Sequence, residues 1–200
     1  MILEGIVTSV AADGEINIAP MGPEVSFSME RLLLKPFRTA QTFRNLAAHG
    51  EGVFHVTDDV LLLAQAALGV VAPPPELFAA ERVRGYVLRN CCRYYEFRVS
   101  ASDTSQERAR LDALVVKCGT LRDFFGFNRA KHAVVEAAIL ATRTDFLPLE
   151  EVDAEFRKLA TIIDKTGGDQ EQRAFELLRG HVARVREERA GASSGKQCLS

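Results

Sequence analysis

The first 21 residues alternate between apolar and polar side chains, as strands that are buried on one face do. Residues 2–10 are rich in β-branched side chains, and residues 16–21 continue the alternation. Asp13-Gly14 lies between the two segments and favours a hairpin turn, because both positions tolerate a positive φ. Pro20 lacks a backbone donor, so we expect regular pairing to end there. The pattern predicts a β-hairpin with a broken edge.

Short apolar segments continue through the first half of the chain. Strands are predicted at residues 25–29, 30–36, 52–56, 83–100 and 111–118, with a break near Asn90. A short helix is predicted after Thr39 and ended by Gly50, and a second over residues 60–68, capped by Asp58 or Asp59. Short strands at regular spacing favour a closed or sandwiched β architecture.

The hydrophobic period changes after residue 127. Asn128 is a predicted cap for an Ala-rich helix that ends near residue 142, and apolar residues then recur every three or four positions over residues 149–163 and 175–185. These two segments predict an antiparallel helical hairpin, with Asp169 and Gln172 resembling a capping box. We therefore expect a β domain over residues 1–127, a helical region over residues 128–190 and a disordered tail over residues 191–200.

Composition narrows the class of protein. The chain has 200 residues and a formal net charge of −2, which argues against a nucleic-acid-binding module. It contains neither a segment long enough to span a membrane nor a signal peptide, so we expect a cytoplasmic protein that does not bind membranes. Cys91 and Cys92 are adjacent in a predicted strand, and no Cys-x-x-Cys pattern occurs, so we expect reduced structural thiols and no metal site. A redox role for the two thiols is the alternative.

Four motifs follow one another along the chain: EGIVT at residues 4–8, NIAPMG at 17–22, RTAQTFRNL at 38–46 and NRAKH at 128–132. In this order and spacing they resemble the FMN-binding split-barrel superfamily, which includes flavin reductases and flavoredoxins. The resemblance is closest to the family called domain of unknown function 447, and it covers residues 2–185.

The resemblance implies a mainly β fold with α: a split β-barrel of the FMN-binding type, followed by a small C-terminal helical region. It also implies a homodimer with FMN at the subunit interface. The flavoprotein, without an assigned substrate, is either an oxidoreductase of the flavin reductase or flavoredoxin type or an FMN-binding protein with no turnover of its own. A nicotinamide nucleotide or another electron donor would bind transiently, because the chain has no dinucleotide-binding motif or P-loop. The alternative is a non-enzymatic dimeric β-barrel that binds another anionic ligand or a protein partner.

An FMN phosphate requires backbone donors, hydroxyls and a cation. Arg38, Thr39 and Thr42 offer these at a predicted helix start, where free N–H groups and the helix dipole favour an anion, and neither Arg38 nor Thr42 belongs to the predicted core. Alternatively, Thr39 is only an N-cap and Arg38 is solvated. Asn45 either binds the ligand or holds the turn.

The flavin ring requires an apolar slot with amide partners at its polar edge. Asn17, Ala19, Pro20 and Met21 are the candidates, because backbone groups at the predicted broken edge would face the ring. Met21 as a filler of the core is the alternative.

Asn128, Arg129, Lys131 and His132 crowd one predicted helix N-terminus. Cations there oppose the helix dipole, so an anion such as the phosphate, in the same or the partner subunit, would explain them. Alternatively, they reach solvent or an acidic neighbour such as Glu136. His132 as a general acid lacks a marked base or nucleophile beside it.

Overall fold

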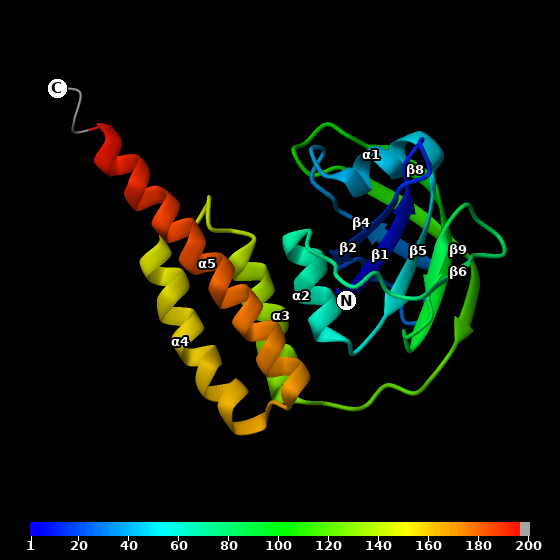
Figure 1. Cartoon of the computed structure of the whole chain (residues 1–200). Coiled ribbons are helices and arrows are strands. Elements are labelled where there is room, and N and C mark those ends of the chain that lie inside the picture. Colours follow the sequence, from blue (N-terminus) through cyan, green and yellow to red (C-terminus); the bar gives the residue numbers. More distant parts are fainter. Residues whose placement is uncertain (197–200) are drawn as a thin grey trace. The chain divides into compact units, whose positions relative to one another are not determined.

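The computed structural model describes residues 1–196, with side chains to residue 191. The chain forms two compact units, which we call the barrel unit (Met1–Asp58 and Val71–Phe125) and the helical unit (residues 59–70 together with the chain from Gly126 onward). Figure 1 shows the helices and strands of both units, coloured along the sequence. Residues 59–70 were expected within the β domain, because their predicted helix is flanked on both sides by strands.

The barrel unit is built on one curled antiparallel sheet. Its strand order is β2-β1-β5-β8-β9-β4-β3, and a second sheet pairs β6 with β7. The N-terminal residues close the barrel, because Leu3 N donates to Pro23 O at 3.1 Å and Val25 N donates to Met1 O at 2.8 Å. The bounds are β1 Gly5–Val10, β2 Ile16–Met21, β3 Glu24–Val25, β4 Arg31–Leu34, β5 Glu51–Val56, β6 Leu77–Ala79, β7 Tyr86–Leu88, β8 Arg93–Asp103 and β9 Arg110–Thr120. The predicted split barrel is confirmed.

The predicted first hairpin forms, with Gly14 at a φ of 95° in the turn between β1 and β2. Pairing does not end at Pro20, however, because Pro20 lies opposite Ile6 within the β1–β2 ladder. β2 is an edge strand of the sheet, and there a proline can direct its missing donor away from the ladder. The expected broken edge is therefore an ordinary sheet edge.

The core of the barrel lies inside the curl of the sheet. Its largest buried side chains include Val7, Leu32, Leu34, Leu46, Phe54, Tyr95, Phe97 and Leu111. Gly5 is required for the close approach of β1 to β5, because a Cβ there would lie 2.3 Å from the carbonyl oxygen of His55. The β6–β7 hairpin covers part of the outer face, where Phe78 packs edge-on against Tyr94 with 6.0 Å between ring centroids.

Helix α1 (Gln41–His49) lies in the barrel unit and contacts β1 and β2. Its N-cap is Ala40, without a side-chain cap, so Thr39 is not the N-cap that the sequence offered as one interpretation. Gly50 ends the helix at a φ of 67°, as predicted. The side chain of Thr39 is consequently exposed and free of a capping role.

The helical unit contains α2 (Val60–Leu68), α3 (Arg129–Ala141), α4 (Leu149–Thr166) and α5 (Asp169–Lys196). α4 and α5 form the predicted hairpin, with Phe156 and Phe175 stacked at 5.4 Å, and α2 packs against α3 and α5 (Figure 1). The capping interaction at α5 differs from the prediction: Gly168 N donates to Glu171 Oε2 at 2.8 Å, one residue earlier than the predicted pair. α5 is helical to Lys196, past the predicted tail boundary, and residues 197–200 lie outside the described residues.

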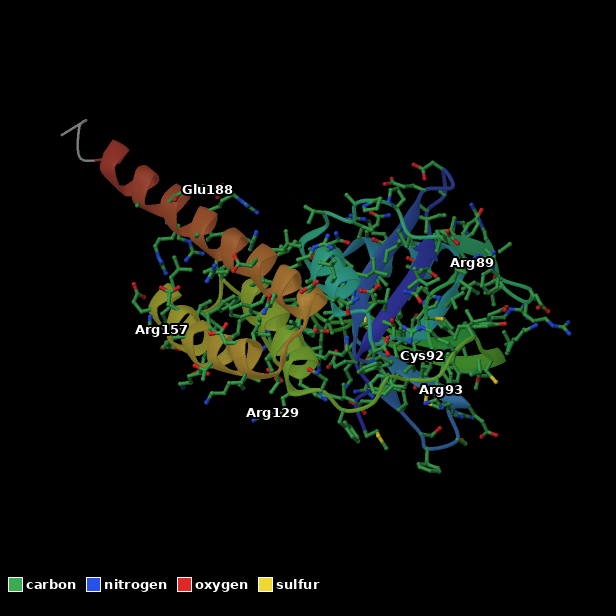
Figure 2. The ribbon with its side chains drawn as sticks, turned by 60° about the horizontal axis from the view of Figure 1, so that its bottom comes forward. Arg89, Cys92, Arg93, Arg129, Arg157 and Glu188 are labelled. Carbon is green, nitrogen blue, oxygen red and sulfur yellow. The ribbon has the colours of Figure 1, made fainter. Side chains whose placement is uncertain are left out.

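Cys91 and Cys92 are buried, but they lie in the turn before β8 rather than in a strand (Figure 2 labels Cys92 beside Arg93, the first residue of β8). Burial raises the pKa of the Cys91 thiol to about 12. Cys91 is therefore protonated near neutral pH and is a poor nucleophile. Among the described residues, no helix is long and apolar enough to cross a membrane.

Candidate functional site

Four buried or half-buried polar side chains meet where the β1–β2 hairpin contacts α1. Ser9 is fully buried at the centre, and its Oγ accepts hydrogen bonds from Asn45 Nδ2 at 3.0 Å and from Asn17 Nδ2 at 3.3 Å. Asn17 Nδ2 also donates to Thr42 Oγ1 at 3.0 Å. Polar groups in a buried position require such partners, so this cluster ties the hairpin to the helix.

A chain of hydrogen bonds, which we call the relay, connects the cluster along α1 to the surface, and each of its amides has a fixed donor and acceptor side. Arg44 donates to Gln41 Oε1 from Nε at 3.1 Å and from Nη2 at 2.8 Å. Gln41 Nε2 in turn donates to Asn45 Oδ1 at 2.6 Å. Because arginine has donors only, it fixes which way the Gln41 and Asn45 amides point. The oxygen and the nitrogen of the Asn45 amide are thus both hydrogen-bonded within the chain, which supports the interpretation that Asn45 holds the turn.

Thr42 does not lie at the surface as its sequence context suggested. Its side chain is 3% exposed, and its hydroxyl oxygen accepts the Asn17 N–H. The expectation that Thr42 lies outside the core is therefore wrong. A hydroxyl that accepts one bond still carries its own proton, so Thr42 retains one donor.

A pocket of about 380 Å³ is lined by Arg38, Thr39, Phe43 and Glu107, and Phe43 directly follows Thr42 of the cluster in α1. Its walls are held by backbone pairing between residues 36–38 and 107–109, in which Arg38 N donates to Glu107 O at 3.1 Å. Arg108 turns to the other face, with its guanidinium 3.8 Å from the Phe37 ring centroid. The exposed Arg38 guanidinium and Thr39 hydroxyl therefore face an open pocket on a fixed backbone.

The remaining barrel candidates follow β2 from this pocket. Ala19 and Pro20 are half-buried, and β2 is an edge strand, so every second residue directs its backbone groups away from β1. Met21 packs against the barrel core, as the core-filler interpretation expected. Any contribution of Met21 to a site would therefore come from its backbone.

Asn128 and Lys131 lie in the helical unit, and both are engaged within it. Asn128 Oδ1 accepts from Lys131 N at 3.1 Å and its Nδ2 donates to Thr166 O at 3.1 Å, so it is the predicted cap of α3. Lys131 Nζ pairs with Glu171 Oε1 at 2.7 Å and bonds Gln170 at 3.0 Å. Burial acts to raise the pKa of Glu171, but the bonds from Lys131 and Gly168 hold it below its ordinary value. Glu171 thus supplies the negative charge that this helix start required.

Two other members of that motif remain at the surface. Arg129 is exposed at the first position of α3 (Figure 2). His132 is also exposed and stacks on Phe127 with 6.2 Å between ring centroids. No described base or nucleophile is placed beside His132 by a hydrogen bond or an ion pair.

Sequence reasoning missed the residues that hold the barrel site together. Ser9, Gln41 and Arg44 order Asn17, Thr42 and Asn45, and Phe43 and Glu107 complete the pocket around Arg38. One signal was present: Thr8-Ser9 is a polar pair inside an otherwise apolar strand that is buried on both faces. A buried strand hydroxyl must find a partner, and here the partners come from β2 and α1.

The closed antiparallel sheet, its short helix against the first hairpin and its C-terminal helices define a split β-barrel protein, and the solved structures that share this fold include flavin-binding proteins. The chain belongs to the family described as protein of unknown function DUF447. The model of its N-terminal domain matches residues 3–122, and the model of its C-terminal part matches residues 128–180.

Solved structures support the same assignment of fold. An FMN-bound DUF447 protein from Methanosarcina mazei is 22% identical, covers 90% of this chain and 94% of its own, and superposes with a TM-score of 0.78. A flavoredoxin from Methanosarcina acetivorans is 13% identical over 60% of this chain and 68% of its own, with a TM-score of 0.52. The flavin reductase of the styrene monooxygenase from Pseudomonas putida S12 is 12% identical over 60% and 82%, with a TM-score of 0.50. No curated protein matches this chain.

Proposed function

We propose that this protein is a flavoprotein that binds FMN in the barrel unit, with the phosphate in the Arg38–Thr39 pocket. The observation that carries the proposal is this pocket, which offers a cation and a hydroxyl on fixed backbone at the start of α1, the helix that contacts β2. The FMN-bound state of the M. mazei family member supports it. A single arginine with neighbouring hydroxyl and backbone donors is the chemistry that a terminal phosphate requires.

The geometry of β2 orders the rest of the ligand. Asn17 is bonded to Thr42 near the phosphate pocket, whereas Met21 lies four residues further along the strand, about 13 Å away at 3.3 Å per residue. An extended ribityl phosphate covers the first part of this distance, and the flavin ring covers the rest. The isoalloxazine ring therefore lies along Ala19, Pro20 and the Met21 backbone. Asn17, which the sequence analysis assigned to the ring, is reassigned to the end of the ligand nearer the phosphate.

The chemistry we propose is electron transfer through the flavin, of the flavin reductase or flavoredoxin type. Bound FMN supplies the redox centre, and the chain supplies the site that holds it. A nicotinamide nucleotide or another electron donor would bind only transiently, without a domain of its own in this chain. This arrangement agrees with a sequence that carries no dinucleotide-binding motif of its own.

We also propose that the protein acts as a homodimer. Apolar side chains are exposed on β9 and directly after it, where Leu114, Val116, Leu121 and Phe124 are between 38% and 44% exposed. A second copy of the chain would cover such a strip. Sedimentation at micromolar concentration should show a species of twice 22.0 kDa, and a monomer alone would contradict the proposal.

The test of the proposed function is direct. The purified protein, reconstituted with FMN and desalted, should retain a flavin absorption spectrum. Mass spectrometry of the ligand released by denaturation should identify FMN. Recovery of FAD from the expressed protein, or loss of all flavin after reconstitution, would contradict the proposal. The latter result would favour the alternative, a barrel that binds another anion.

A further inference from the structure

The Asn17 side chain has a defined set of remaining hydrogen-bonding groups. A primary amide has two donors on nitrogen and one acceptor oxygen. Asn17 Nδ2 uses its donors on Ser9 Oγ at 3.3 Å and Thr42 Oγ1 at 3.0 Å. Among the described residues, none donates to Oδ1, and Asn17 is half-buried and bonded to Thr42, the chain neighbour of Phe43 in the pocket lining. Towards a ligand, Asn17 therefore presents an acceptor only.

The relay behind Asn17 fixes the donor that Asn45 directs at Ser9 Oγ. Arg44 donates to the Gln41 amide oxygen and so orients that amide. Gln41 orients the Asn45 amide in the same way, and Asn45 Nδ2 donates to Ser9 Oγ. A flipped Asn17 amide would place Oδ1 against the hydroxyl oxygens of Ser9 and Thr42. It would have to take the protons of both hydroxyls, including the Thr42 proton that otherwise remains for the ligand. The orientation in the structure keeps one donor at Thr42 and one acceptor at Asn17.

The position of this acceptor identifies the part of the ligand that it meets. A phosphate at neutral pH carries mostly unprotonated oxygens, so an amide oxygen would repel it. The only N–H of the oxidised flavin ring is on the pyrimidine edge, away from the ribityl attachment, whereas Asn17 lies 3.0 Å from Thr42 at the phosphate end. The ribityl chain between the two carries hydroxyl groups, which can donate to an amide oxygen.

We propose that Asn17 Oδ1 accepts a hydrogen bond from a ribityl hydroxyl and so makes the site specific for flavins that carry this chain. The inference rests on the proposed FMN function. Ser9 and Thr42 act as positioning residues, because their hydroxyl oxygens accept both N–H groups of Asn17 and leave its amide oxygen for the ligand. Thr42 donates its proton at the phosphate end of the same ligand.

Three ligands separate the contributions: lumiflavin has the ring alone, riboflavin adds the ribityl chain, and FMN adds the phosphate. Fluorescence titration gives the affinity of each for the parent protein and for Asn17→Leu, with Thr39→Val as the control, because Thr39 lines the phosphate pocket and does not bond Asn17. One neutral hydrogen bond corresponds to about three- to tenfold in affinity. The parent should bind riboflavin more tightly than lumiflavin by at least this factor. Asn17→Leu should lose that gain, and Thr39→Val should mainly lose part of the gain from riboflavin to FMN.

The outcomes separate this inference from the function on which it rests. If the parent binds riboflavin no better than lumiflavin, the inference is wrong even though the protein binds flavin, and this result needs no variant. If Asn17→Leu weakens lumiflavin as much as riboflavin, Asn17 holds the fold or the ring, and the inference is again wrong. If the parent binds none of the three ligands, the proposed function fails together with it.

Discussion

Two places in this chain carry the same sequence signal, a cation and an amide at the start of a helix, and the structure uses them differently. At α1, Arg38 remains exposed in a pocket, and Thr42 and Asn17 each keep one hydrogen-bonding group that no described residue uses. At α3, Asn128 caps the helix, and Lys131 is paired with the buried carboxylate of Glu171. The first cluster has unused binding capacity, whereas the second is largely satisfied from within.

The comparison shows how a binding site is distinguished from a structural one. A cation near a helix N-terminus requires a compensating negative charge, and the chain provides one at α3 through Glu171. At Arg38 the described residues form no ion pair, although Glu107 lines the same pocket. We therefore place the ligand phosphate at α1, and the predictions below test whether the α3 cluster is structural.

The largest effect is expected from Lys131→Met. The side chains of Lys131 and Glu171 are 15% and 7% exposed, and removing one partner of such a pair leaves a buried charge uncompensated. We expect a loss of about 3 kcal/mol in the free energy of unfolding. Urea denaturation should show this loss, hydrogen exchange should locate it in α3 and α5, and FMN affinity of the folded protein should not change.

The double variant Lys131→Met/Glu171→Leu is the control, because it removes both charges and should recover part of the lost stability. A tenfold loss of FMN affinity in Lys131→Met without a loss of stability would mean that the lysine binds the ligand.

Lowering the pH should destabilise the two units at different pH values. His55 is fully buried in the barrel, with Nδ1 donating to Ile6 O and Nε2 accepting from Leu88 N, each at 3.1 Å. Burial lowers its pKa from 6.5 to about 4. Between these values the unfolded chain binds a proton that the folded barrel does not, so stability falls as the pH falls through this window, by about 3 kcal/mol in all.

The contrast in the helical unit is Glu171, whose pKa lies below its ordinary value of 4.5. Its contribution to stability is complete above pH 4.5 and is lost as the pH falls through the lowered pKa of the folded state. Hydrogen exchange at pH 7, 5.5 and 4.5 should therefore show the barrel strands losing protection first. The barrel effect should be absent in His55→Gln, and its persistence there would contradict the assignment.

A smaller effect is expected from Asn128→Ala, which removes the cap of α3 and the bond to Thr166 O. Loss of an N-cap costs about 1 kcal/mol. Asp59→Ala is the matched variant, because Asp59 Oδ1 caps α2 of the same unit by accepting from Leu62 N at 3.0 Å. Both should lower the urea midpoint by similar amounts. A selective loss of FMN binding in Asn128→Ala would contradict the structural role of the α3 cluster.

The sequence predicted what depends on local pattern. The alternation over residues 2–21 gave the first hairpin, and Gly50 and Asn128 marked helix ends that the structure confirms. Pro20 was misjudged because the position of β2 at the sheet edge is a property of the whole sheet. Cys91 and Cys92 were misjudged because the break predicted near Asn90 extends through both cysteines, and β8 begins only at Arg93.

The candidate site was less predictable because its bonds join distant residues. Ser9 bonds Asn45 across 36 positions, and Lys131 bonds Glu171 across 40, so no local pattern reveals either pair. Motif resemblance identified the RTAQTFRNL segment, but the burial of Thr42 and the exposure of Arg38 come from how α1 packs on β1 and β2. The assignment of one predicted anion site to a ligand and the other to Glu171 therefore required the fold.

The most direct test of the central claim is a pair of titrations, FMN and riboflavin, against Arg38→Ala, with Arg129→Ala as the matched exposed arginine. A hydrogen bond to a charged group contributes about 1.5–3 kcal/mol, and each 1.4 kcal/mol is tenfold in affinity. We predict that Arg38→Ala weakens FMN by about ten- to a hundredfold and leaves riboflavin unchanged, while Arg129→Ala changes neither. Equal weakening of both ligands by Arg38→Ala, or selective weakening of FMN by Arg129→Ala alone, would contradict the placement of the phosphate in the barrel unit.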